Sequence, residues 1–138
     1  MSMVAGKYNI TCQQGSTFDL QLTLQYTNPD YPGNCEDPEV CPEFLIWDLT
    51  GYTARMQVRK YIDSATPIAT LTTENISTFR IILGNADPDD GTINLFIRAE
   101  DTRAISTSGV YDIEIISPSN EVDRILEGDF ILSKEVTR

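Results

Sequence analysis

The sequence predicts an all-β protein, an antiparallel β-sandwich of two sheets, and three observations carry that prediction. Apolar and polar residues alternate with a period of two along most of the chain, as in strands with one buried face. Turn-forming stretches such as "NPDYPGN", "DSATP" and "SPSNE" divide the chain into about eight short segments. The length of 138 residues is that of one ordinary domain, so we expect a single β-sandwich domain over 1–138.

The clearest strand is expected at residues 18–26, where the alternation is unbroken. Its apolar face holds Phe18, Leu20, Leu22, Leu24 and Tyr26. Residues 8–12 alternate in the same way, and further strands are expected at about 52–60, 67–73, 79–84, 92–98, 109–117 and 122–133. The one helical stretch is short, a turn or two near 99–105. Strands of this number and spacing favour an immunoglobulin-like arrangement.

The strand expected at 52–60 has two different faces. Its apolar face, which we expect in the core, consists of Tyr52, Ala54, Met56 and Val58. The opposite face carries Arg55 and Arg59, which either pair with carboxylates on neighbouring strands or meet an acidic patch on another subunit. In the strand at 122–133 the residues that share the core face are Leu126, Phe130 and Leu132, with Gly128 between them.

A long acidic loop is expected at about residues 28–47. Its middle part, "DYPGNCEDPEVCPE", has three prolines, two cysteines and five acidic residues but no Lys or Arg, which argues against strand or helix. Cys35 and Cys41 could form a local disulfide, and three cysteines without a histidine do not make a zinc site. The apolar root of the loop contains Phe44, Ile46 and Trp47, which either contact a neighbouring subunit or cap the core.

The composition argues against several classes of function. A net charge of −11 disfavours nucleic acid and anionic membrane as partners. The sequence has no histidine, the commonest general base, and no phosphate-binding loop or nucleophile elbow. No apolar run approaches the length of a membrane span. We therefore expect no enzymatic activity, no catalytic residue, no cofactor, no metal and no small-molecule substrate.

Several stretches, taken in their order and spacing, resemble a known family. They are "DLTGYTARMQVR", "LTTEN", "GTINLFI" followed by "AEDT", "GVYDIEI" and "RILEGDFILSKEVTR". They are similar to small β-sandwich proteins of tailed bacteriophages, nearest to the N-terminal domain of the phage baseplate upper protein. The resemblance covers most of the chain from Tyr8 onward.

The resemblance implies a structural protein of the virion, made in the host cytoplasm. Such a protein assembles in multiple copies in the tail, baseplate or neck as an adaptor or connector. Its partners would be other virion proteins, copies of itself, or both. Two alternatives stay open, a capsid decoration (cement) protein and a glycan-binding module.

Overall fold

The computed structural model describes residues 6–33, 37, 41, 44–74, 78–84 and 90–137, which form eleven strands and one short helix. The strands are β1 (Gly6–Lys7), β2 (Ile10–Gln13), β3 (Phe18–Thr23), β4 (Gln25–Thr27), β5 (Phe44–Ile46), β6 (Thr53–Arg59), β7 (Ala69–Thr72), β8 (Phe79–Leu83), β9 (Thr92–Ile97), β10 (Gly109–Ile116) and β11 (Val122–Ser133). The helix, α1 (Ala99–Arg103), lies inside the stretch expected to be helical. Among the described residues, no helix is long and apolar enough to cross a membrane.

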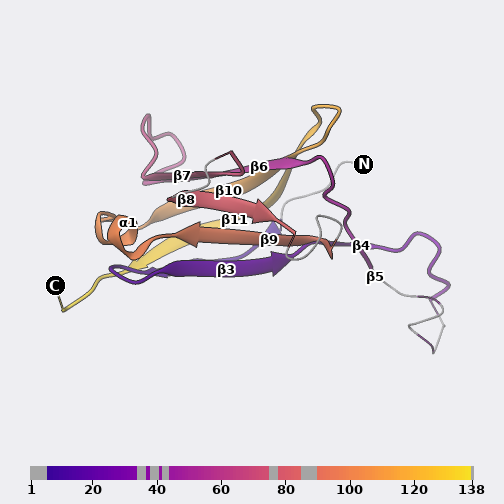
Figure 1. Cartoon of the computed structure of the whole chain (residues 1–138), viewed down its shortest axis with the longest axis horizontal. Coiled ribbons are helices and arrows are strands. Elements are labelled where there is room, and N and C mark those ends of the chain that lie inside the picture. The colour runs from indigo at the N-terminus through magenta and orange to yellow at the C-terminus, as the bar shows by residue number, and fades with distance from the viewer. Residues whose placement is uncertain are drawn as a thin grey trace.

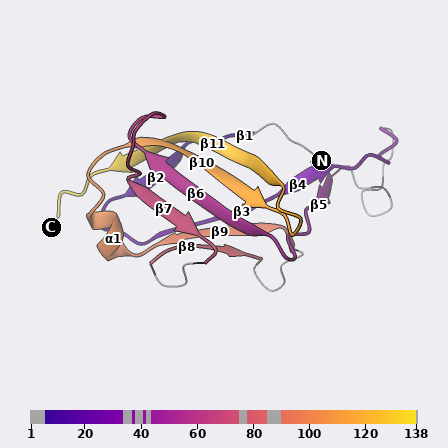
Figure 2. The ribbon, with the colours of Figure 1, turned by 90° about the horizontal axis from the view of Figure 1, so that it is seen from above.

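Nine of the strands form one sheet that curls over into two layers (Figures 1 and 2). The strand order is β1–β11–β10–β6–β7–β8–β9–β3, and β2 also pairs with β11. The layer β11–β10–β6–β7 faces the layer β3–β9–β8, which corresponds to strands GFCC′ facing strands BED in an immunoglobulin variable-type domain. The fold is therefore all-β and immunoglobulin-like, as the sequence predicts.

The two layers are joined along one side. β7 and β8 share a single parallel register pair, Thr72 with Arg80, whereas β6–β7 and β8–β9 are antiparallel. The predicted pair of sheets is thus one continuous sheet that bends at β7 and β8. Alternation could not reveal this join, because it reports which side of a strand is buried and not which strand lies beside it.

The core lies between the layers and follows the predicted alternation. In β6, Ala54, Met56 and Val58 are buried and the residues between them are not. β10 does the same with Tyr111, Ile113 and Ile115. Phe130 of β11 and Phe18 of β3 meet across the layers with ring centroids 6.4 Å apart. Burial of this apolar surface is the main favourable term in folding.

β3 buries its apolar face less than the sequence predicts. Phe18 is buried, but Leu20, Leu22 and Leu24 are half-buried and pack against the margin of the core. Among the described strands β3 pairs with β9 alone, so its other side has no neighbouring strand. The predicted face is correct, and the predicted depth of burial is wrong because β3 lies at the edge of the sheet.

A bulge in β11 changes which of its residues are buried. Leu126 pairs with Ile113, but Arg124 already pairs with Glu114, so Ile125 is an extra residue on β11. Such a residue shifts the alternation by one position. Ile125 is therefore buried and Leu126 is half-buried. Strict alternation over 122–133 assigns Leu126 to the core and misses Ile125.

Cys12 is a free thiol buried in β2. Burial raises its pKa from 9.0 to about 11, because the thiolate loses its hydration in the core. Folding thus favours the neutral thiol, and this contribution to stability is complete below pH 9 and is lost as the pH rises through about 11. We expect the free energy of unfolding to fall more steeply over this range in the wild type than in Cys12→Ala. Urea denaturation at several pH values measures both profiles, and parallel profiles would contradict the expectation.

Candidate functional site

The two ends of the expected long loop are held by a two-stranded ribbon outside the main sheet (Figure 1): β4 precedes the loop and β5 lies at its end. β4 follows β3 directly, and β5 pairs antiparallel with it in the register Gln25↔Ile46, Tyr26↔Leu45, Thr27↔Phe44. Leu24, between β3 and β4, donates its N–H to the carbonyl of Gly91 at 2.8 Å and accepts at its own carbonyl from the N–H of Trp47 at 3.0 Å. The first hydrogen bond fixes the ribbon to the residue before β9, and the second joins the two chains of the ribbon at its root.

The ribbon has one exposed apolar side. Alternation along β5 places Phe44 and Ile46 on one face, beside Thr27 and Gln25, and turns Leu45 to the other. The side chains of Phe44 and Ile46, here called the ribbon patch, are 53% and 51% exposed. Single exposed apolar residues are common on protein surfaces. Two together on a projecting ribbon with polar neighbours have the composition of a contact surface.

Trp47, expected to share that contact or to cap the core, lies at the root of the ribbon. It is only 9% exposed, and its ring packs edge-to-face against Tyr26 with centroids 5.6 Å apart. Together with Asp48 and Tyr52 these two aromatic residues line a shallow hollow of about 310 Å³. Trp47 therefore anchors the ribbon on the sandwich and offers a partner little surface. Of the three residues, Trp47 thus caps the core, whereas Phe44 and Ile46 are available for contact.

Gly91 allows the ribbon to pack closely on β9. Its φ is +72°, and a Cβ at this position would lie 2.9 Å from the carbonyl oxygen of Leu24 and 2.5 Å from Cγ2 of Ile46. Glycine tolerates both the positive φ and the close backbone because it has no Cβ. The sequence indicates only that Gly91 is a turn glycine before a strand. It does not predict that the ribbon packs against this residue.

The two arginines of β6 have different partners. Arg55 donates from Nε to Oε1 of Glu114 on β10 at 2.7 Å, which is one of the two arrangements expected from the sequence. An exposed pair of this kind is worth less than about 1 kcal/mol. The guanidinium of Arg59 donates instead to the Ser64 carbonyl at 2.7 Å and to Oε1 of Gln57 at 2.8 Å. Both arginines are thus engaged within the chain, which makes them weaker contact candidates than the ribbon patch.

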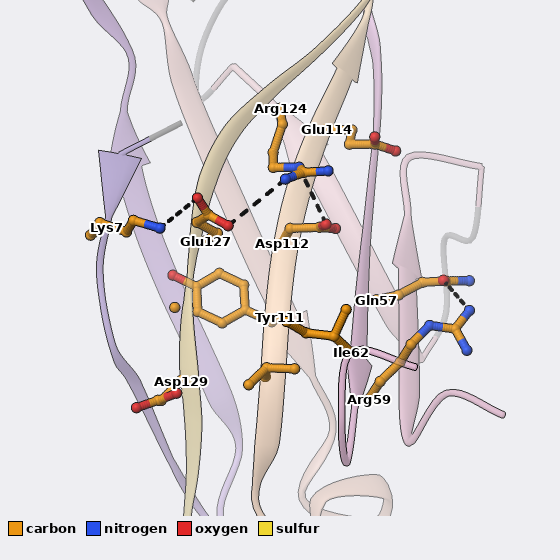
Figure 3. A pocket seen from close by; sticks show the side chains of 12 residues that line it. Lys7, Gln57, Arg59, Ile62, Tyr111, Asp112, Glu114, Arg124, Glu127 and Asp129 are labelled. Carbon is orange, nitrogen blue, oxygen red and sulfur yellow. Dashed lines mark hydrogen bonds and ion pairs between the residues drawn. The ribbon is translucent and has the colours of Figure 1, made fainter. Parts of the chain in front are cut away.

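A polar groove of about 440 Å³ lies over β11, β10 and β6 (Figure 3). A row of ion pairs crosses it: Lys7 to Glu127 at 2.7 Å, Glu127 to Arg124 at 3.9 Å, and Arg124 to Asp112 at 3.5 Å. Positive and negative groups alternate along this row, so each charge has an opposite charge beside it. The four charges of this row therefore offset one another.

The carboxyl groups of this groove titrate differently. Burial raises the pKa of Asp112 above its usual value, whereas the hydrogen bond from Lys7 lowers the pKa of Glu127. A raised carboxyl pKa occurs in some catalytic sites, but a general acid needs a second group aimed at the same reacting atom. Here the neighbouring carboxylates, Glu114 and Glu127, are held in ion pairs of their own. Within the described residues, no group of three or more His, Cys, Asp or Glu side chains could hold a metal ion.

The cysteines of the acidic loop are only partly described. Cys41 is disulfide-bonded. Cys35 lies outside the described residues, so the Cys35–Cys41 pairing stays a prediction.

No family model and no curated protein matches the sequence. Among solved structures, the chain is similar to one described as "Crystal structure of ICOS in complex with ICOS-L and an anti ICOS-L VNAR domain". The identity is 14% and the TM-score is 0.45, and the match covers 95% of this chain and 56% of that one. The chain thus spans little more than half the length of this structural neighbour. The immunoglobulin-like fold follows from the strand order itself.

Proposed function

We propose that this protein is a structural subunit of a tailed-phage particle, assembled in multiple copies in the tail, baseplate or neck as an adaptor or connector. The observation that supports this most directly is the ribbon patch, with Phe44 and Ile46 each more than half exposed on a ribbon outside the main sheet. The resemblance of stretches such as "DLTGYTARMQVR" and "GVYDIEI" to phage β-sandwich proteins supplies the class of particle. In this proposal the ribbon patch is covered by a neighbouring subunit.

The energetics of the ribbon patch suit an assembly contact. Removing apolar surface from water is worth roughly 25 cal/mol per Å². Truncating one of the few hot-spot residues at the centre of an interface costs about 2 kcal/mol or more. At a net charge of −11, copies of the chain repel one another in general, which favours solubility before assembly. A short-range apolar contact then determines where two subunits meet.

The double variant Phe44→Ser/Ile46→Ser tests the proposal in phage particles that carry it in place of the wild type. We expect the folded variant to be present in purified particles at an occupancy reduced about tenfold or more, which corresponds to about 1.4 kcal/mol of lost contact energy. Quantitative mass spectrometry of the particles measures the occupancy, and circular dichroism of the isolated variant checks its fold.

The matched control is Tyr61→Ser/Ile62→Ser. These two residues are also an exposed aromatic and aliphatic pair, 66% and 82% exposed, between β6 and β7. We expect this control to enter particles at the wild-type level. Full occupancy of the ribbon-patch variant, or equal losses in the two variants, would rule out the ribbon patch as the contact.

A further inference from the structure

We propose a second contact, in which the open edge of β3 and β4 pairs antiparallel with the same edge of a second copy of this chain, about a two-fold axis at Thr23. The biological use of this contact rests on the proposed role of the protein as an assembly subunit. The contact adds to that role a specific partner, a second copy of the chain. It uses the backbone edge of the strands and leaves the ribbon patch free for another neighbour.

β3 and β4 belong to different sheets but follow one another along residues 18–27 with only Leu24 between them (Figure 1). The hydrogen bonds of Leu24 to Gly91 and Trp47 show that β9 and β5 lie on the same side of these strands. Backbone groups alternate in direction along a strand, so the residues at odd positions turn their N–H and C=O to the other side. These are Asp19, Gln21, Thr23, Gln25 and Thr27. No described strand pairs with that side.

This edge lacks the features that usually prevent edge-to-edge pairing, such as lysines, prolines, bulges or a very short strand. The run "FDLQLTLQYT" contains no Lys, Arg, Pro or Gly, and Asp19 is its one charged residue. Its register with β9 is regular. The opposite edge of the sheet consists of β1 and β2, of only two and four residues, and carries the exposed Lys7, whereas β3 alone has six residues. The long and nearly uncharged edge is therefore the one suited to pairing.

The polar side of the edge is complementary to itself. With the axis at Thr23, Gln21 lies opposite the partner's Gln25, and Asp19 lies opposite the partner's Thr27. All five odd-numbered side chains from Asp19 to Thr27 are exposed and free to take part in such pairs. Like charges directly opposite one another destabilise a strand pair, and this register places none together. For a chain of net charge −11, a stripe with one acid in ten residues is a favourable place for a second copy to approach.

The apolar side of the edge is complementary in the same register. Leu22 lies opposite the partner's Leu24, and Leu20 lies opposite the partner's Tyr26. In the single chain all four side chains are only half-buried. Pairing would extend the sheet across the axis and cover this row with the same row of the second copy, which adds apolar burial to the backbone hydrogen bonds.

Sedimentation velocity of the full chain over a concentration series, up to about 1 mM, tests the contact. We expect a reversible monomer–dimer equilibrium in the wild type and in Phe44→Ser/Ile46→Ser. Thr23→Pro should weaken the dimer about tenfold or more. Proline removes the N–H of residue 23, which points to the open side and would bond to the second copy, while the hydrogen bonds between β3 and β9 do not use this N–H. A wild type that stays monomeric throughout overturns the inference and leaves this edge to a different chain. A dimer that tolerates Thr23→Pro overturns it as well.

A second variant keeps the test decisive if Thr23→Pro fails to fold. Thr23→Cys places two thiols beside the proposed axis, so mild oxidation should produce a disulfide-linked dimer. The control is Thr70→Cys, an exposed threonine on the interior strand β7. Cross-linking at residue 23 and not at residue 70 supports the contact. No cross-link at residue 23, or equal cross-linking at both positions, overturns it.

These experiments use the isolated protein, so they are independent of the occupancy measured in particles. The edge contact can fail while the ribbon patch is supported, and the ribbon patch can fail while the edge contact is supported.

Discussion

Replacing Phe130 with alanine is expected to lower the free energy of unfolding by about 3–5 kcal/mol. Phe130 is fully buried in β11 and meets Phe18 of the opposite layer, so its truncation leaves a cavity between two layers whose backbones cannot close it. A domain of ordinary stability has roughly 5–15 kcal/mol in total, so the loss is a large share. Urea denaturation at constant pH measures it.

Phe44→Ala is the matched control, since it makes the same chemical change at a phenylalanine that is more than half exposed on the ribbon. Its expected cost is below about 1 kcal/mol. Similar losses at the two positions, or a loss at Phe130 below about 1.5 kcal/mol, would show that the register of β11 against the core is wrong.

Gly128→Ala is expected to cost about 1–3 kcal/mol although it adds a single methyl group. A Cβ on Gly128 would overlap the carbonyl oxygen of Tyr8, where the chain passes from β1 to β2. That carbonyl accepts a hydrogen bond from the hydroxyl of Tyr111 at 2.5 Å. Burial raises the pKa of the Tyr111 phenol, which keeps it protonated and able to donate. Moving Tyr8 would leave a buried hydroxyl without its acceptor, which adds to the cost.

Gly6→Ala is the control for the added methyl group, because the nearest heavy atom to its Cβ would be Cδ1 of Leu126 at an ordinary 3.4 Å. Its expected effect lies within about 0.5 kcal/mol. Gly128→Ala and Tyr111→Phe should be non-additive in a double-mutant cycle, since both act through the carbonyl of Tyr8. Strict additivity of the two changes would contradict the proposed linkage.

Alternation in the sequence is sufficient to predict most strands of this fold, because each of those strands keeps one face in the core. Met56 in β6 and Ile113 in β10 are examples, since both are fully buried at positions where the period of two places them inside. The short helix near Thr102 also lies where the sequence indicates it. Local burial of one face is therefore encoded in single segments and can be read from them.

The remaining features depend on contacts between segments, which alternation does not encode. Leu22 is only half-buried because no described strand flanks the outer side of β3, and Ile125 enters the core because β11 bulges opposite β10. In β5 the three residues "FLI" are all apolar, so they show no period of two. The sequence pattern therefore cannot distinguish a buried strand from a ribbon on which Phe44 and Ile46 are exposed. The candidate contact could thus be located at the root of the loop, but its exposed face could not be predicted.

A density map of an intact phage particle, resolved well enough to trace the main chain, tests the proposed function. We expect this chain in several copies in the tail, baseplate or neck, with the β4–β5 ribbon against a neighbouring subunit and Phe44 and Ile46 buried there. A particle that lacks this chain, or one in which every copy turns the ribbon patch to solvent, would contradict the proposal.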